Sequence, residues 1–405
     1  MLPTALEGVR VVDLTHHIAG PYSTKLLADY GADVVKVERP EGGDATRRLG
    51  PFFHDVPNIE GSGLFLHLNT NKKSLTLNLH AEAGRKIVRE LIKDADILVE
   101  SFRPGFLPSL GLGYEELEKI NPRLVMTSIS NFGQTGPYRD YKMSEITMYA
   151  LGGTMYSTGD QDREPVKLAL TAEQFFAGMI AATATLGACL GAMAHGAGQH
   201  IDLSLMEIMA GNQDRAVQSH TNYQYTGAVG VRAGGGASRN ILPSGVYPCA
   251  DGYVQLFALQ PVWDRVCLMI DRPDLINDPY FTAPENFTGN PITKAEFDAI
   301  LLEWLLERPK QEIMEKAQSV GYFCGAINSI DEVFEDKHLQ AREYFVEVDH
   351  PYTGPLRYPG AQFKMSETPM QPGRAPLLGE HTTQVLKGLG YTVEDIVRLR
   401  EQGAI

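Results

Sequence analysis

The chain has 405 residues, of which 43% are hydrophobic and 21% are charged, so it can bury a large core and is expected to fold as two domains. The net charge of −14 argues against a nucleic-acid partner, because phosphate contacts need clustered basic side chains that the sequence lacks. The N-terminal segment does not read as a secretion signal, so we expect a cytoplasmic protein. The four cysteines have no metal-ligand spacing and indicate buried thiols in a reducing compartment, with no metal: Cys189, Cys249, Cys267 and Cys324.

The first 135 residues alternate between β and α patterns. Residues 9–14 are a short apolar strand, a glycine-bearing turn leads into a helix, and residues 32–39 form a second strand. This is the βαβ unit of a doubly wound α/β domain, with the helix N-terminus positioned for an anionic ligand. The turn lacks GxGxxG, so a dinucleotide site is poorly supported.

The same alternation continues along the chain. A loop and strand are expected in 68–79, an amphipathic helix in 81–95, and further strands in 96–102 and 123–133. The sheet should be mostly parallel, with the loops at its carboxyl edge forming the site.

A long helix without charged side chains is expected from Phe175 to Met193, the most distinctive stretch of the chain. Its length could span a membrane, but its Gly and Thr content and the lack of a second such segment favour a buried helix. Glu173 and Gln174 stand in its first turn, where backbone N–H groups and the helix dipole stabilise negative charge.

Residues 227–240 are rich in glycine and are expected to be either a flexible connector or a mobile lid over a ligand. Short strands and helices follow in 241–325. We therefore predict a large α/β domain over 1–225, a small domain over 226–327, and a return of the chain to the large domain over 328–405.

Seven patterns occur in one order along nearly the whole chain and together resemble the class III coenzyme A transferases. They are GVRVVDLTHHIAGP, YGADVVKVERPEGGDATR, NTNKKSLTLNL, ADILVESFRPGFL, LGLGYEEL, NPRLV with SISNFGQTGPY, and PLLGEHT with LGYTVEDIVRL. The resemblance implies a Rossmann-like large domain built from both ends of the chain, a smaller middle domain, and two subunits threaded through each other in an interlocked dimer.

The resemblance also implies a mechanism in which an aspartate carboxylate attacks an acyl-CoA thioester and forms a mixed anhydride. By the family pattern that aspartate stands nine residues after Pro165 and four before Gly178, and here the residue is Gln174. An amide is a poor nucleophile. Glu173 is adjacent, but consecutive helix residues point about a hundred degrees apart, so it is a weak catalytic candidate and its alternative role is a charge partner of the helix N-terminus.

Further matches and departures concern the CoA pocket. Ser101 stands where the family usually has asparagine, Ser109 where it has an arginine suited to phosphate, and Ile18 where formyl-CoA transferase has glutamine. His381 and the His16–His17 pair are interpreted as structural rather than catalytic. By resemblance, seven residues border the CoA pocket: His16, Ala19, Arg39, Leu77, Phe102, Lys142 and Glu145.

Three hypotheses follow from these residues. The chain is the non-catalytic subunit of a heteromeric CoA transferase whose homologous partner carries the aspartate, similar to the two-subunit succinyl-CoA:(R)-benzylsuccinate CoA transferases of anaerobic aromatic degradation. Alternatively, it is an active homodimeric CoA transferase or acyl-CoA racemase that uses Glu173. In the third hypothesis it binds CoA or has a structural role without catalysis. The expected ligands are a CoA thioester and a small carboxylic acid, with no membrane or nucleic acid.

Overall fold

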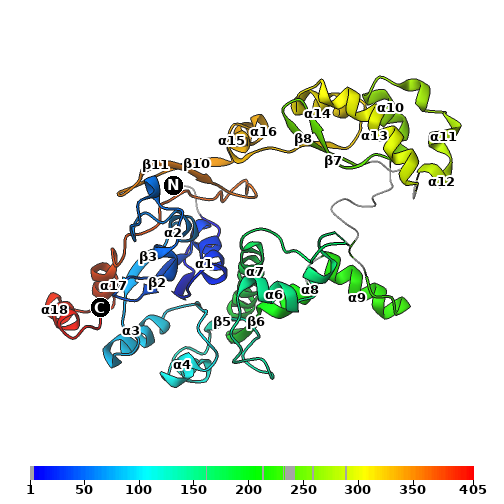
Figure 1. The fold of residues 1–405 in the computed structure, drawn as a ribbon. Helices are drawn as coiled ribbons and strands as arrows, with labels where there is room; N and C mark the ends of the chain where they lie inside the picture. The colour runs from blue at the N-terminus through cyan, green and yellow to red at the C-terminus, as the bar shows by residue number, and fades with distance from the viewer. Residues whose placement is uncertain are drawn as a thin grey trace. The chain divides into compact units, whose positions relative to one another are not determined.

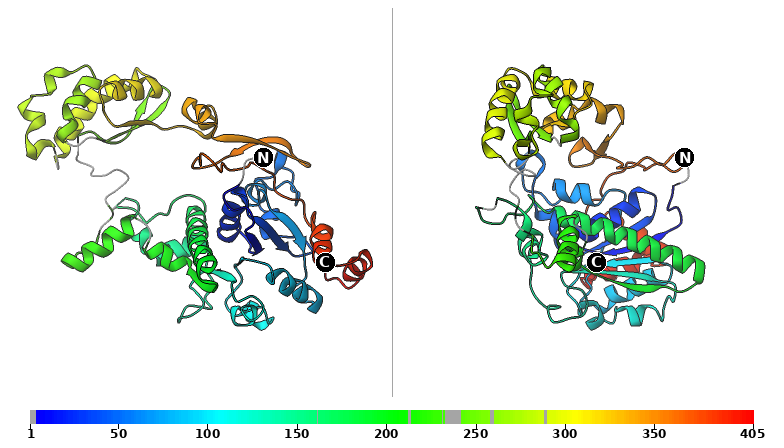
Figure 2. Two further views of the ribbon diagram at one scale, coloured as in Figure 1. Left: turned by 180° about the vertical axis from the view of Figure 1, so that it is seen from behind. Right: turned by 90° about the vertical axis from the view of Figure 1, so that its right-hand side faces the viewer.

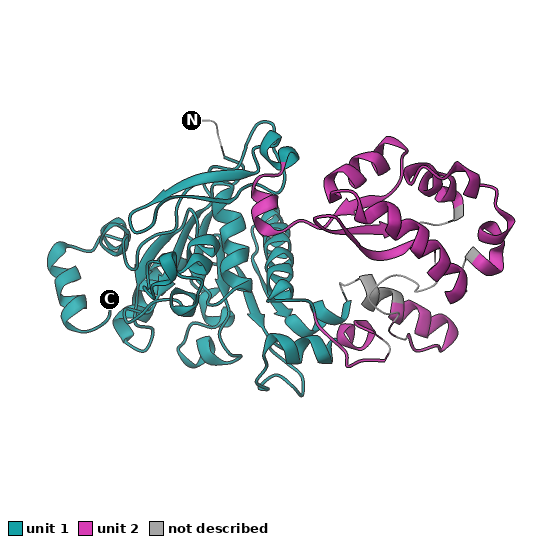
Figure 3. Ribbon diagram, turned by 45° about the horizontal axis from the view of Figure 1, so that its top comes forward, with its two compact units in different colours: residues 1–152, 168–213, 337–405 teal, residues 153–167, 214–336 magenta. Residues whose placement is uncertain are grey.

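The structure, a computed structural model, describes residues 4–160, 162–211, 214–230, 232, 242–257, 260–287 and 290–405 (Figure 1). The chain forms two compact units (Figure 3). The first contains residues 1–152, 168–213 and 337–405, and the second contains 153–167 and 214–336. The domain boundaries at 225/226 and 327/328 stay predictions, and most of the glycine-rich run 227–240 lies outside the described residues.

A six-stranded parallel sheet forms the centre of the first unit, in the order β3-β2-β1-β4-β5-β6. From β1, the next two strands in the chain, β2 and β3, lie on one side. The following strands, β4, β5 and β6, lie on the other side of β1. The order therefore reverses between β1 and β4, and doubly wound sheets bind ligands at the carboxyl ends of such strands. The strands are β1 (Arg10–Leu14), β2 (Asp33–Glu38), β3 (Lys73–Thr76), β4 (Ile97–Glu100), β5 (Val125–Ser130) and β6 (Gln199–Ser204).

The strands are buried on both faces because neighbouring apolar residues point to opposite sides of the sheet. Val11 packs in a cluster with Ala177 and Ala181, whereas the next residue, Val12, packs in a cluster with Ile87 on the other face. Helices therefore cover both sides (Figure 2). The predicted parallel α/β sheet is confirmed.

Helices of the first unit fall into two layers and several connections. Helices α1 (Ala19–Asp29) and α7 (Ala172–His195) share one core cluster with the sheet, and α3 (Glu82–Ile92), α17 (Thr382–Gly388) and α18 (Val393–Glu401) share the other. The remaining helices are α2 (Gly63–Leu68), α4 (Phe106–Ser109), α5 (Tyr114–Leu117), α6 (Glu145–Leu151), α8 (Leu205–Gly211) and α16 (Lys337–Ala341). Strands β10 (Phe345–His350) and β11 (Gly354–Pro359) pair as an antiparallel hairpin.

The second unit has its own core, in which Trp263, Phe281 and Phe297 pack together beside a three-stranded antiparallel sheet. Its strands are β7 (Ser244–Cys249), β8 (Gly252–Phe257) and β9 (Cys324–Ala326). Its helices are α9 (Asp214–Thr226), α10 (Trp263–Met269), α11 (Pro279–Thr282), α12 (Pro284–Phe287), α13 (Pro291–Leu306), α14 (Lys310–Ser319) and α15 (Ile330–Phe334).

All four cysteines of the chain are free thiols in buried positions, as predicted.

Helix α7 is the long helix that the sequence predicts, and it ends where Gly196 adopts a left-handed conformation. By length and composition it could cross a membrane, and 44% of its most apolar window is buried. Gly178 allows α7 to approach α1 closely: a Cβ atom at this position would lie 2.7 Å from the carbonyl oxygen of Ala19 and 3.0 Å from the Tyr22 side chain. The small residues therefore set the distance between the two helices.

The Arg47 guanidinium joins the sheet to the C-terminal segment and is fully buried. Its Nε and Nη2 donate to the two carboxylate oxygens of Glu38 at 2.7 and 2.9 Å. Nη1 donates to Glu60 at 2.7 Å, and Nη2 also donates to the carbonyl oxygen of Pro376 at 3.1 Å. The plane lies 3.6 Å over the Phe65 ring. One side chain thus connects the end of β2 to residues more than three hundred positions later.

The C-terminal segment is also tied to β3. His381 Nδ1 accepts from the backbone N–H of Ser74 at 3.2 Å, and His381 N donates to the Ser74 carbonyl oxygen at 2.9 Å. Thr382 Oγ1 accepts from Thr76 N at 3.1 Å. His381 therefore acts as the structural hydrogen-bonding residue that the sequence predicts.

We expect Gly178→Ala to lower the free energy of unfolding by about 1–3 kcal/mol, because the added methyl group overlaps the α1 backbone. The matched control is Gly187→Ala in the same helix, where a Cβ atom meets nothing within 4 Å and helix propensity should raise stability by up to about 1 kcal/mol. Urea denaturation measures both. Equal shifts in the two variants would contradict the close helix contact.

Arg47→Met should lower the free energy of unfolding by about 3–5 kcal/mol, because it leaves the Glu38 carboxylate buried without its cation. The loss should be smaller at pH 5 than at pH 8, since protonation of Glu38 then removes the uncompensated charge. Arg48→Met is the control: Arg48 is exposed and its change should stay within about 0.5 kcal/mol. Similar losses in the two variants would show that the buried pair is not important.

Candidate functional site

A cavity of about 520 Å³ lies at the carboxyl ends of β1, β2, β3 and β4, and we call it the edge cavity. It lies where the strand order reverses, at the edge at which the sequence places the site. It brings together four of the predicted residues: His16, Arg39, Leu77 and Phe102. The other lining residues are Leu14, Val37, Glu38, Pro40, Glu41, Asn78, Leu79, His80, Phe106, Gly403 and Ile405.

The walls of the edge cavity are mainly apolar and aromatic, with a cation on one side. Leu77 is buried, Phe102 is half-buried and Arg39 is exposed. Burial, assisted by the charge of Lys36, lowers the pKa of His16 to about 4, so its imidazole is neutral at pH 7. Its Nδ1 is buried without a hydrogen-bond partner among the described residues. The cavity therefore suits a ligand with an apolar or aromatic part, and Arg39 can contact a negatively charged part, although the acids Glu38 and Glu41 also line the wall.

Charged side chains form a buried layer next to the edge cavity. Asp13 on β1 accepts hydrogen bonds from Lys72 Nζ at 3.0 Å and from Thr24 Oγ1 at 2.7 Å, and Lys36 Nζ lies 2.8 Å from Asp44. Burial alone would raise the pKa of Asp13, but Lys36 and Lys72 overcome this effect and lower the pKa to about 2. Asp13 therefore stays ionised and accepts from Thr15 N in the loop after β1, while Lys36 holds Asp44 in the loop after β2.

The turn after β4 forms one wall of the edge cavity. Ser101 Oγ accepts from His16 N at 2.8 Å, so the loops after β1 and β4 are joined across the point where the strand order reverses. Glu100 accepts from Phe102 N at 2.7 Å and is buried. Burial raises the pKa of Glu100 to about 7, although hydrogen bonds from Ser128 and Phe102 N act to lower it.

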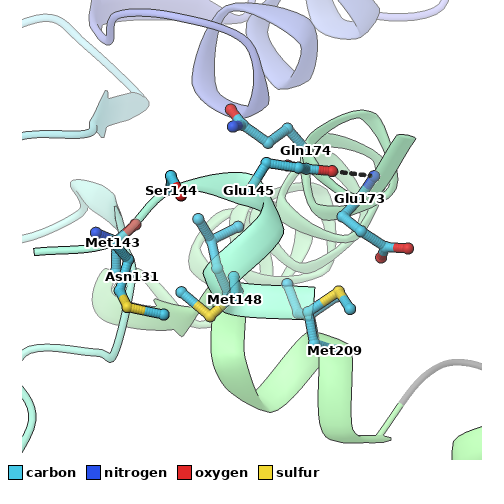
Figure 4. Close-up of a pocket in the computed structure, with 10 residues that line it drawn as sticks. Asn131, Met143, Ser144, Glu145, Met148, Glu173, Gln174 and Met209 are labelled. Carbon is cyan, nitrogen blue, oxygen red and sulfur yellow. Dashed lines mark hydrogen bonds between the residues drawn. The ribbon is translucent and has the colours of Figure 1, made fainter. Parts of the chain in front are cut away.

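A second, smaller cavity of about 50 Å³ lies at the start of α7, and we call it the helix-start cavity (Figure 4). It brings together Glu145, Glu173 and Gln174, all of which the sequence analysis singled out. The other lining residues are Asn131, Met143, Ser144, Met148, Leu205, Ile208 and Met209. None of the described lining residues is basic, and three methionines make much of the wall apolar.

The first turn of α7 receives a carboxylate from another helix. Glu145 Oε1 accepts from the backbone N–H of Glu173 at 3.3 Å. Figure 4 shows that the side chains of Glu173 and Gln174 leave the helix in different directions. Glu173 is buried, with 6% of its surface exposed. Two acidic residues therefore lie at this helix start, Glu173 in the first turn of α7 and Glu145 from α6, and the amide of Gln174 stands beside them.

Ala19 and Lys142 do not line either cavity. The Ala19 carbonyl faces Gly178 at the α1–α7 contact, and Lys142 is exposed in the segment before α6. Of the positions that depart from the family pattern, Ile18 is buried at the N-terminus of α1, and Ser109 Oγ donates to the Phe106 carbonyl oxygen at 2.7 Å.

Sequence reasoning missed Glu100, Phe106 and the methionines of the helix-start cavity. Alternation along β4 places Glu100 on the same face as Leu98, so an acidic residue at the end of a buried strand was the available signal.

No group of three or more His, Cys, Asp or Glu side chains in the described part of the chain could hold a metal ion.

Comparisons with known proteins agree with this geometry. A sequence model of CoA-transferase family III matches residues 6–382. A formyl-CoA:oxalate CoA-transferase of Streptomyces avermitilis is 36% identical, over 99% of this chain and 99% of its own length. A succinate–glutarate CoA-transferase of Agrobacterium fabrum is 34% identical, over 95% of each chain.

Solved structures show the same fold. The crystal structure of a CaiB/BaiF family protein from Brucella suis has a TM-score of 0.83 and 31% sequence identity, and the match covers 96% of this chain and 100% of that one. A hypothetical protein from Mycobacterium tuberculosis has a TM-score of 0.77 and 25% identity over 95% of this chain and 99% of its own. Because the family model and the relatives match most of its length, the chain belongs to CoA-transferase family III.

Proposed function

We propose that this chain is the non-catalytic subunit of a heteromeric class III CoA transferase that moves CoA between an acyl-CoA and a free carboxylic acid. The catalytic aspartate would come from a homologous partner chain. The observation that carries this proposal is Gln174, which occupies the position of the nucleophile by the family pattern and stands in the first turn of α7 on the wall of a cavity.

The chemistry explains why this one residue matters. A carboxylate can attack the thioester carbonyl carbon, expel CoA as a thiolate and form an anhydride. The acceptor carboxylate then replaces the first acid in the anhydride, and the CoA thiolate attacks the acceptor's acyl carbon, which forms the new thioester and frees the enzyme's carboxylate. The amide of Gln174 is neutral at pH 7 and is a poor nucleophile. With a glutamine at this position, the chain keeps the cavity but lacks the charged oxygen that would begin the reaction.

Glu173 is a weaker candidate for the nucleophile. It lines the helix-start cavity, which favours an active homodimeric transferase or racemase as the second candidate function. However, its side chain points away from that of Gln174 (Figure 4). Its backbone is bonded to Glu145, and only 6% of Glu173 is exposed. A nucleophile needs access to the thioester, so these features favour a structural role for Glu173.

The edge cavity supports CoA binding by this chain. Phe102, Phe106 and Leu77 supply an apolar and aromatic wall, Arg39 supplies a cation, and His16 Nδ1 offers an unused polar atom. These groups fit a ligand that combines an aromatic base, phosphates and an apolar arm. A subunit that lacks the nucleophile would still bind CoA but would not catalyse its transfer.

The test is to purify the chain alone and together with a homologue that carries aspartate at the equivalent position. We expect CoA binding by the chain alone, and transferase activity only in the mixture. Full activity of the chain alone would rule out the non-catalytic role. If the chain binds no CoA and activates no homologue, a purely structural protein would be the better description.

Gln174→Asp should give the isolated chain the missing nucleophile. We expect a covalent adduct with acyl-CoA, detected by mass spectrometry and cleaved by hydroxylamine, and a rate of CoA transfer on the order of 10²-fold or more above wild type. Glu173→Gln in the wild-type background should change neither. An adduct of the wild-type chain that disappears in Glu173→Gln would instead support the active homodimer.

A further inference from the structure

We propose that Glu100 is a positioning residue for the edge cavity, where its buried carboxyl group holds the backbone of Phe102 and links CoA affinity to the binding of one proton. The inference rests on the proposed binding of CoA in this cavity. Glu100 does not line the cavity. It accepts a hydrogen bond from the backbone of Phe102, which forms part of the aromatic wall.

The geometry connects Glu100 to the wall in two steps. Glu100 is the last residue of β4, only 5% exposed, and its Oε2 accepts from Phe102 N at 2.7 Å. The Phe102 ring then contacts the His16 ring edge-on at 5.3 Å between centroids and the Phe106 ring at 4.7 Å. Displacement of the Phe102 backbone would therefore move the aromatic part of the cavity wall.

The groups that face Glu100 do not compensate its charge. Ser128 on β5 is its register partner and donates a hydrogen bond to it, while Ser128 Oγ also lies 2.9 Å from His200 Nε2 on β6. Burial lowers the pKa of His200, which favours its neutral form, and Tyr114 on α5 stacks on it. Asp202 on β6 disfavours ionisation of Glu100. His16, on the β1 side, is neutral at pH 7.

Ionisation of Glu100 should therefore respond to an anionic ligand. Burial raises the pKa of Glu100 to about 7, so both forms are present near neutral pH. CoA carries several negative phosphate charges, and a like charge nearby favours the protonated form of a carboxyl group. Binding of CoA would then take up a proton. By linkage, affinity is highest below the pKa of the free protein and falls as pH rises through and above about 7.

The test is isothermal titration calorimetry of CoA with the full chain at about pH 6 and about pH 8.5. At the lower pH we expect wild type and Glu100→Gln to bind CoA with equal affinity. At the higher pH we expect wild type to bind CoA roughly three- to tenfold more weakly than Glu100→Gln does. The amide keeps an acceptor for Phe102 N and carries no charge, so it should act as a permanently neutral Glu100. Ionisation of CoA itself cancels in this comparison.

Two further variants separate positioning from general stability. Glu100→Ala removes the acceptor and should weaken CoA binding at both pH values, whereas Glu115→Gln, an exposed acid on α5, should behave as wild type. Circular dichroism and thermal melting check that each variant is folded. Titrations near pH 7.5 in buffers of different ionisation enthalpy should show proton uptake for wild type and less for Glu100→Gln.

The outcomes are distinguishable. CoA binding with the same pH dependence and proton uptake in wild type and Glu100→Gln would overturn the role of Glu100 and leave the proposed function intact. Absence of CoA binding by folded wild type at both pH values would overturn the proposed CoA site, and this inference with it. Loss of the pH dependence in Glu100→Gln alone supports the assignment.

Discussion

The buried pair of Arg47 and Glu38 is the interaction on which the carboxyl edge of the sheet depends. Removing two ions from water is costly, and only good geometry and additional hydrogen bonds offset that cost. Here the guanidinium has carboxylate, carbonyl and aromatic partners on several sides. The pair therefore contributes less through net stability than through position: it fixes the end of β2, and with it the start of the loop that carries Arg39, against the C-terminal segment.

The same principle applies to the neighbouring strands. Asp13 on β1 attracts Lys36 on β2 and Lys72 just before β3, and so ties the first two strands to the start of the third. Burial lowers the pKa of Lys72 to about 8, and the charge of Asp13 opposes this effect. This charged layer lies beside the edge cavity, whose walls include loop residues such as Phe102, and the backbone N–H of Phe102 donates to Glu100.

Much of the fold could be predicted from local pattern. Alternation of strand and helix signals indicated the parallel sheet, and the uncharged stretch before Gly196 indicated α7. The edge cavity also followed, because the carboxyl ends of parallel strands meet at one edge. These features depend on periodicity and on chain direction, both of which are written in the sequence.

Other features depend on contacts between distant segments and could not be predicted. No local signal pairs Glu145 with the backbone of Glu173, or places Pro376 against Arg47. The close approach of the Ala19 carbonyl to Gly178 likewise depends on how α1 and α7 pack, and the place of Ala19 at the CoA pocket stays a prediction. The proximity of Glu100 to Ser128 and Asp202 likewise becomes clear only when the neighbouring strands are in register.

The carboxylate of Glu145 at the start of α7 has a consequence for how such a chain can evolve. In a helix whose first-turn acid is both its reactive group and its electrostatic anchor, exchanging that acid for an amide would cost activity and folding together. Here Glu173 and, from a separate segment, Glu145 place acidic groups at the helix start, so the charge at this end of α7 does not depend on position 174. A duplicated gene with this arrangement can lose catalytic activity through a single substitution and still encode a folded protein, which can then acquire a different function.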